Sequence, residues 1–247
     1  MYCQTRSQLS QTDFEFIAET VGTSTGDREA LVRLANDPDV LSELLHDDRL
    51  FERTMKKPPI LLPISQPLFF YIAIYHAFKY QNIEEDDIVD YVAGICVEFR
   101  SRNTLWQFSS QKEEQTIYFV DLFNLMNDLD RMHQYYLRRY IGNVALFLTG
   151  FFPDFVFQRS KTEGAPSMTY YENIGSAQFE TAASQALHCD EHTAPVLNTL
   201  AERFVQIRSA LNMFTDQYLN LGKHSIAMIE RQAATLEEDN FRRSLEM

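Results

Sequence analysis

The spacing of apolar residues between 131 and 152 predicts a helix around which the chain is organised. Apolar side chains recur there at intervals of four and three, which places them on one helical face. After Tyr140 the other faces are apolar too, as in a buried core helix or a membrane span. Residues 144–152 fall far short of the ~20 residues that a span requires, so we expect a buried central helix. The main face consists of Leu137, Ile141, Val144, Leu148 and Phe151.

Helical patterns also precede this stretch, and no sustained alternation predicts a strand. Residues 10–55 hold several short patterns separated by N-cap signals, of which Asp37-Pro38 is the clearest. Residues 68–78 are nearly all apolar, and Ser65 stands at the position of their N-cap. They predict a second core helix.

Turn and capping signals set the remaining boundaries. Asn82, with a glutamate three residues later, has the pattern of a capping box and predicts the start of the next helix. Pro153 ends the central helix because proline has no backbone N–H to donate. We then expect a polar loop over residues 158–166 and a helix capped by Thr169 that runs to Leu187.

The most regular pattern in the chain covers residues 197–218, where apolar side chains repeat over three heptads. It predicts one helix that begins at Thr193 and Pro195 and ends at Gly222. Such a seam packs either within a molecule or between subunits, so homodimerisation through it is a hypothesis. Its residues are Leu197, Leu200, Phe204, Ile207, Leu211, Phe214 and Tyr218.

These patterns together predict an all-α fold, a multi-helix bundle with a buried central helix near residues 131–152. We expect residues 1–247 to form a single helical domain. Within it, residues 1–57 are expected to form a cap of short helices, and residues 58–236 the main bundle. Residues 237–247 are predicted to be a charged tail.

Composition and charge narrow the class of partner. The net charge of −13 argues against a nucleic-acid partner, which needs a basic surface, and against an anionic membrane surface. We therefore expect no nucleic acid and no stable membrane insertion. Three widely spaced cysteines without a CxxC pair are typical of a reducing compartment. With no apolar signal segment at the start, the expected location is cytoplasmic.

The polar first half of the central helix carries the strongest candidate for a ligand site. Guanidinium groups pair bidentately with carboxylates or phosphates, and tyrosines add donors and ring faces. Alternatively, Glu172 forms an internal ion pair with one of these arginines, because buried charges need partners. Both interpretations stay open from the sequence. The candidate ligand-binding residues are Tyr136, Arg138, Arg139, Asn143, Tyr171 and Glu172.

Metal-ligating residue types cluster only loosely. His188 and His192 share a helical face and flank Cys, Asp and Glu, but HExxH is absent and a surface linker without metal is expected. Two acid-x-x-His pairs, at Glu43 and at Asp130, resemble parts of a di-iron bundle site, but no further glutamates complete it. We therefore expect no cofactor and no metal.

Signatures of catalysis are also missing. The chain has no P-loop and no G-x-G-x-x-G, and its one G-x-S-x-G match, Gly22 to Gly26, lies in a turn without the preceding strand that a nucleophile elbow requires. Cys96 lies in an apolar helix and is expected in the core. His76 lies on an apolar helix as well and is predicted to be a hydrogen-bonded core histidine rather than a ligand.

Three segments together resemble a group of uncharacterised bacterial all-helical proteins. The first is Tyr-Ile-Gly-Asn-Val-Ala-Leu-Phe-Leu-Thr-Gly-Phe-Phe-Pro-Asp, at residues 140–154. The others are residues 164–175, which contain Tyr-Tyr-Glu-Asn-Ile-Gly, and residues 204–218. The resemblance implies a helical fold, and it brings no activity and no catalytic residue.

The sequence therefore predicts a non-enzymatic cytoplasmic protein that acts through protein–protein interaction, as a homodimeric adaptor or a regulator. The alternative is a helical bundle that binds a small ligand or a metal, with or without catalysis. Converging polar groups around an open cavity would favour the alternative, and polar groups that close on each other would not.

Overall fold

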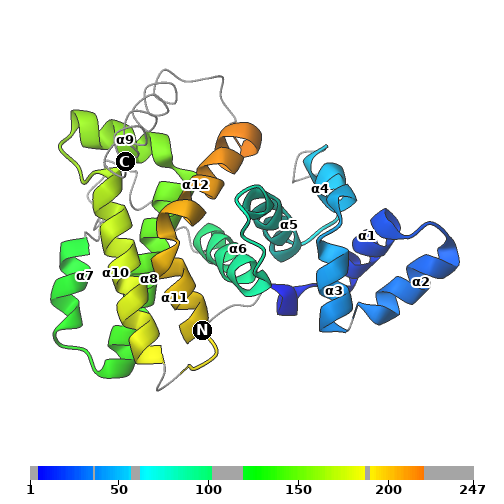
Figure 1. The fold of residues 1–247 in the computed structure, drawn as a ribbon, viewed down its shortest axis with the longest axis horizontal. Coiled ribbons are helices and arrows are strands. Elements are labelled where there is room, and N and C mark those ends of the chain that lie inside the picture. The colour runs from blue at the N-terminus through cyan, green and yellow to red at the C-terminus, as the bar shows by residue number, and fades with distance from the viewer. Residues whose placement is uncertain (1–4, 36, 57–61, 102–118, 187–189, 220–247) are drawn as a thin grey trace, which may run out of the picture.

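The computed structural model describes residues 5–35, 37–56, 62–101, 119–186 and 190–219 (Figure 1). Within these ranges the chain forms the helices α1 to α12, a short 3₁₀-helix, η1, and a short π-helix, η4, and no strand. The prediction of an all-α multi-helix bundle is confirmed. The predicted charged tail and Gly222 lie outside the described residues.

Four short helices form the N-terminal region, and Figure 1 shows them together at one end of the molecule. Each starts at a polar side chain that accepts from a backbone N–H of the first turn, which replaces a missing helical hydrogen bond. Ser10 and Ser24 form complete capping boxes. The elements are η1 (Arg6–Gln8), α1 (Gln11–Val21), α2 (Thr25–Leu34), α3 (Pro38–Leu45) and α4 (Asp48–Met55).

The remaining helices build the larger part of the fold. In Figure 1, α5 and α6 lie in the middle of the molecule, between the short helices and a group that contains α8, α10, α11 and α12. The elements are α5 (Gln66–Lys79), α6 (Asp86–Ser101), α7 (Phe119–Met126), α8 (Arg131–Phe151), α9 (Pro153–Thr162), α10 (Met168–Ala186), α11 (Ala194–Glu202), α12 (Phe204–Phe214) and η4 (Thr215–Leu219).

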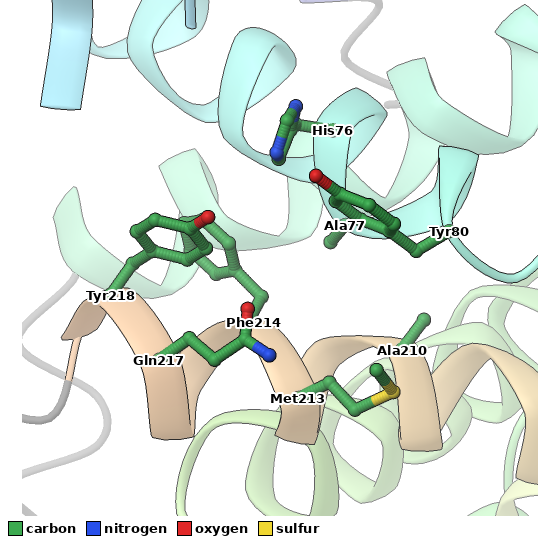
Figure 2. A pocket seen from close by; sticks show the side chains of 8 residues that line it. All are labelled: His76, Ala77, Tyr80, Ala210, Met213, Phe214, Gln217 and Tyr218. Atoms are coloured by element: carbon green, nitrogen blue, oxygen red, sulfur yellow. The ribbon is translucent and has the colours of Figure 1, made fainter. Parts of the chain in front are cut away.

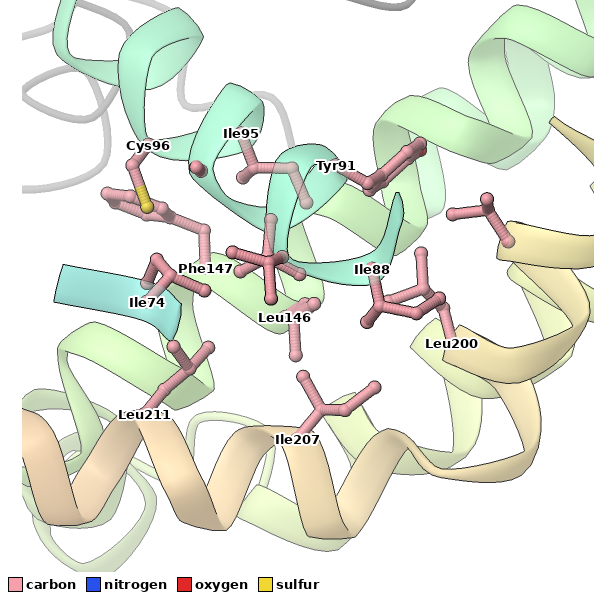
Figure 3. Close-up of a cluster of buried hydrophobic side chains, with 14 of the residues drawn as sticks. Ile74, Ile88, Tyr91, Ile95, Cys96, Leu146, Phe147, Leu200, Ile207 and Leu211 are labelled. Atoms are coloured by element: carbon pink, nitrogen blue, oxygen red, sulfur yellow. The ribbon is translucent and has the colours of Figure 1, made fainter. Parts of the chain in front are cut away.

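Helix α8 is the buried central helix that the sequence predicts, with every residue from 141 to 150 buried. Two glycines let α10 approach it closely. A Cβ on Gly142 would lie 2.7 Å from the Phe179 ring, and one on Gly175 would lie 3.0 Å from Cβ of Ala145. Figure 3 shows apolar side chains from α5, α6, α11 and α12 gathered around Leu146 of α8. The core therefore joins the middle of the molecule to the α8–α12 group.

The heptad pattern of residues 197–218 does not form one helix, so that prediction is wrong. The chain leaves helical geometry at Arg203, which separates α11 from α12, and the last turn widens into the π-helix η4. The guanidinium of Arg203 is held 2.6 Å from Glu85 and also donates to the carbonyl of Asn82. Six seam residues are at most 3% exposed: Leu197, Leu200, Phe204, Ile207, Leu211 and Phe214.

The seam consequently packs within the molecule. Only Tyr218, which is 41% exposed, keeps an accessible surface. The break at Arg203 leaves the apolar stripe continuous, because α11 and α12 turn the same face toward the core. This burial agrees with the internal alternative for the heptads, and homodimerisation stays a hypothesis.

Three predicted boundaries differ from the structure. Residues 158–162 belong to α9 rather than to a loop, because Pro153 starts a new helix after ending α8. Asn82 has a positive φ of 53° and belongs to the turn before α6, which starts at Asp86. Helix α10 starts one residue before Thr169, and Ser167 accepts from the backbone of the first turn.

Among the described residues, no single helix is long and apolar enough to cross a membrane. Helices α8 and α9 reach the required length and composition only as a pair, and the chain bends by 93° between them.

Candidate functional site

The predicted site on α8 is a buried cluster centred on Arg139, which is 7% exposed. Its Nη1 donates to the Tyr135 hydroxyl at 3.3 Å, and that hydroxyl donates to Asp190 at 3.1 Å. Burial raises the pKa of Tyr135, so the hydroxyl keeps its proton and can donate. Asp190 also lies 3.9 Å from the guanidinium and balances its charge.

Aromatic rings complete the surroundings of Arg139. The guanidinium carbon lies 5.8 Å from the ring centre of Tyr91, 5.4 Å from that of Tyr135 and 6.0 Å from that of Tyr136. Its Nε has no hydrogen-bond partner within the described part of the chain, but cation–π contacts stabilise the charge there. The Tyr91 hydroxyl donates to Asn143 at 2.9 Å. The polar groups of this cluster therefore interact mainly with each other.

The other predicted site residues lie elsewhere. Arg138 donates to Gln178 at 2.9 Å, and Tyr171 packs edge-on against Phe119. Glu172 is buried and lies 2.9 Å from Arg208 of α12, so an internal ion pair exists but with a different arginine from those predicted.

The distance between Glu172 and the Arg139 cluster follows from the packing of α8 on α10. Gly175 of α10 faces Ala145 of α8, and Phe179 faces Gly142, so the two helices run antiparallel. Glu172 therefore lies beside about residue 148, roughly 14 Å along the axis from Arg139 at ~1.5 Å per residue. The six predicted residues do not form one site.

The metal candidates do not gather either. His188 lies outside the described residues, and His192 is exposed. The part of the chain that the structure describes contains no group of three or more His, Cys, Asp or Glu residues that could hold a metal ion. Of the two acid-x-x-His pairs, Asp130 caps α8 through His133, and His46 pairs with Asp86 at 2.7 Å.

A different site lies between α5 and the end of α12. A pocket of about 280 Å³ opens there, and Figure 2 shows side chains of both elements facing the same space. Apolar and aromatic side chains form most of its wall, with a few polar edges. The lining residues are His76, Ala77, Tyr80, Ala210, Met213, Phe214, Gln217 and Tyr218.

His76 is the most unusual group of this pocket. It is 9% exposed, and its ring stacks on Phe51 with 3.3 Å between ring centres. The rings of Tyr80 and Tyr218 lie edge-on to it, at 4.9 and 6.2 Å. Nε2 is buried and has no hydrogen-bond partner among the described residues. The core position of His76 is thus confirmed, but the prediction that the ring is hydrogen-bonded is wrong for Nε2.

The pocket carries no formal charge near neutral pH. Burial lowers the pKa of His76 below its usual 6.5, so the imidazole is neutral at pH 7. The two charged neighbours that affect this pKa, Asp48 and Lys79, pair with each other at 2.7 Å and do not line the pocket. The walls therefore offer ring faces, a thioether and neutral polar groups.

Contacts between the end of α5, α12 and η4 bring these side chains together. The C-terminal end of α5 is tied to α12, because Gln206 donates to the Gln81 carbonyl at 2.7 Å. The π-helix η4 then brings Tyr218 against Phe214, with 5.4 Å between ring centres, and against Phe51. Such π-helical turns occur often at functional sites. The pocket thus depends on a local widening of the helix.

Sequence reasoning missed this site. The wall joins residues 76–80 to residues 210–218, which lie far apart in the chain and meet only in the folded protein. The one available signal is a histidine within an otherwise apolar helix, and a core role explains that pattern equally well.

Comparisons with known proteins do not add to this geometry: the chain matches no protein-family model, no curated protein and no solved structure. The resemblance suggested by residues 140–154, 164–175 and 204–218 stays a prediction.

Proposed function

We propose that the protein binds a small molecule in the pocket between α5 and α12. The observation that carries this proposal is the buried, unpartnered Nε2 of His76 beside an open pocket. A buried polar group without a partner costs about 1–3 kcal/mol. A bound molecule that supplies the missing hydrogen bond removes this cost.

The rim of the pocket supports the same function. Tyr80, Met213 and Tyr218 are 63%, 43% and 41% exposed, so apolar surface lies at the entrance. A ligand that covers these side chains gains the free energy of burying apolar area. The volume of about 280 Å³ lies at the lower end of the roughly 300–1,000 Å³ range of ligand pockets, which fits a small compound.

Protein–protein interaction as a homodimeric adaptor stays a prediction, together with the cytoplasmic location. Six of the seven seam residues that motivated the homodimer are at most 3% exposed, so an interface through them would require the fold to rearrange. The small-molecule function needs no such rearrangement, and we therefore prefer it.

A ligand screen by NMR on protein with 13C-labelled methionine methyl groups tests the proposal. Met213 lines the pocket, so we expect compounds from a mixed library of charged, aliphatic and aromatic fragments to shift its methyl signal saturably. Gln217→Trp places a large ring in the pocket and should abolish these shifts.

Val205→Trp is the matched control, because Val205 lies on α12 and is 38% exposed but does not line the pocket. It should leave the shifts unchanged. The proposal fails if no fragment shifts the Met213 signal. It also fails if the Gln217→Trp variant binds the fragments as tightly as the Val205→Trp variant does.

A further inference from the structure

We propose that the ligand is an uncharged, planar aromatic compound with a hydroxyl group at its ring edge, of the phenol class, hydrogen-bonded to Nε2 of His76. This inference rests on the proposed function and names the chemistry of the same pocket. Shape, charge and hydrogen bonding each contribute one part of the argument.

The shape of the wall favours a flat ring. Phe214 and Tyr218 stack on each other at an interplanar angle of 29°, and the Tyr80 ring stands opposite them across the space in Figure 2. Aromatic ligands can meet such walls by offset stacking or edge-to-face contact. Met213 adds a polarizable sulfur that makes favourable contacts with ring edges.

Because the wall lacks charged side chains, ions are poor ligands for this pocket. The lining contains no Asp, Glu, Lys or Arg, and His76 is neutral at pH 7. A carboxylate or an ammonium group would lose its water here without gaining a counter-ion. The ligand is therefore expected to be neutral.

The hydrogen-bonding requirement selects a hydroxyl. In a neutral imidazole one nitrogen donates and the other accepts, and the tautomer decides which role Nε2 has. A hydroxyl can donate or accept, so it partners Nε2 in either tautomer. A plain hydrocarbon ring leaves the nitrogen as unsatisfied as it is in the empty pocket.

Access to Nε2 requires a side chain to move. The nitrogen is covered in the present arrangement, and Tyr80 lies edge-on to the His76 ring while being the most exposed ring of the pocket. Tyr80 is also the C-cap residue of α5, where the helix ends. A ligand that binds Nε2 has to displace a covering side chain, and exposed side chains such as Tyr80 change rotamer on fast timescales.

The test compares four probes on the full chain: phenol, toluene, cyclohexanol and benzoate, each titrated while the Met213 methyl signal is followed. Phenol should bind on the order of tenfold more tightly than toluene, because only phenol satisfies Nε2. A merely apolar pocket predicts the reverse order, since phenol must give up the hydration of its hydroxyl. Cyclohexanol should bind more weakly than phenol, and benzoate should not bind.

His76→Phe separates the hydrogen bond from the ring. Phenylalanine can keep the stack on Phe51 but has no nitrogen, so phenol affinity should fall on the order of tenfold while toluene affinity stays the same or rises. The methionine methyl spectrum without ligand reports whether the variant is folded. If it does not fold, the order of phenol and toluene in the wild-type protein still decides the question.

Two outcomes overturn the ligand class: toluene binding at least as tightly as phenol to the wild-type protein, or folded His76→Phe binding phenol unchanged. If benzoate or an aliphatic fragment binds best and Gln217→Trp abolishes that binding, the class is wrong and the small-molecule function stands. If no compound shifts Met213, both proposals fail.

Discussion

Arg139 and His76 are both basic side chains buried on apolar helices, but their surroundings differ. Arg139 is surrounded by the Tyr135 hydroxyl, the Asp190 carboxylate and three tyrosine rings. His76 has ring contacts only, and Nε2 is left without a hydrogen bond beside a pocket. The first arrangement is what a structural cluster needs, and the second leaves a place for a ligand.

This difference indicates which buried polar residues of a helical core are candidates for a ligand site. The Arg139 cluster is richer in polar residues and attracts attention from the sequence alone. Yet its groups interact mostly with each other, and the one unpartnered nitrogen, Nε of Arg139, belongs to a guanidinium that lies among three tyrosine rings. At His76 no hydrogen bond of Nε2 has to be broken, but the nitrogen is buried and a neighbouring side chain has to move.

The largest expected effect comes from Arg139→Met, which removes the charge at the centre of the closed cluster. Because Asp190 loses the cation that balances it and the Tyr135 hydroxyl loses a donor, the free energy of unfolding should fall by about 3 kcal/mol. Urea denaturation measures it. Arg138→Met is the control, since Arg138 donates to the neutral Gln178 and its loss should cost about 1 kcal/mol. Equal effects would show that the Arg139 cluster is not the structural centre we describe.

A somewhat smaller effect is expected from Glu172→Gln. The carboxylate lies 2.9 Å from Arg208, which also donates to Asn212 at 2.8 Å, and Asn212 in turn binds carbonyls at the end of α8. Removing the charge should lower the free energy of unfolding by about 2 kcal/mol. Glu180→Gln, at an exposed position of the same helix, should stay within about 0.5 kcal/mol. A Glu172 variant as stable as the Glu180 variant would contradict this.

Unlike the two preceding substitutions, His76→Phe should not lower the free energy of unfolding. It removes a buried nitrogen that has no partner and keeps a ring on Phe51, so stability should stay the same or rise by up to about 1 kcal/mol. Thermal and urea unfolding without ligand measure this. A loss of more than about 2 kcal/mol would mean that Nε2 has a structural partner, and the contrast with Arg139 would disappear.

The smallest effect concerns pH. In the unfolded chain the pKa of His76 is ~6.5, and burial lowers it in the folded protein. Between these two pKa values the unfolded state binds more protons, so the stability that neutral His76 contributes is complete above pH ~6.5 and decreases as the pH falls below it. The difference in unfolding free energy between wild type and His76→Phe should therefore shift in favour of the variant from pH 7 to pH 5. A constant difference would contradict a buried neutral imidazole.

Much of the fold was predictable because it depends on local patterns. The caps at Ser10, Asp37 and Ser65 act within one helical turn, and the buried central helix follows from apolar residues on all its faces. The same periodicity could not reveal the break at Arg203, since both sides of the break keep their apolar residues in phase.

The site was less predictable because its contacts are not local. The sequence identifies Arg139 and Glu172 as buried charges that need partners, but the partners Asp190 and Arg208 follow from how α8, α10 and α12 pack. His76 meets Tyr218 only because η4 widens the end of α12. The periodicity of apolar residues predicts neither the partners of these charges nor the π-helix.

The most direct test of the central claim is the 15N NMR signal of Nε2 of His76, followed while phenol is added to the full chain at pH 7. We predict a saturable change in the Nε2 chemical shift with phenol, which reports a new hydrogen bond, and almost none with toluene. An Nε2 signal that stays unchanged while the Met213 methyl signal moves would contradict the claim that the unpartnered nitrogen is the ligand's anchor.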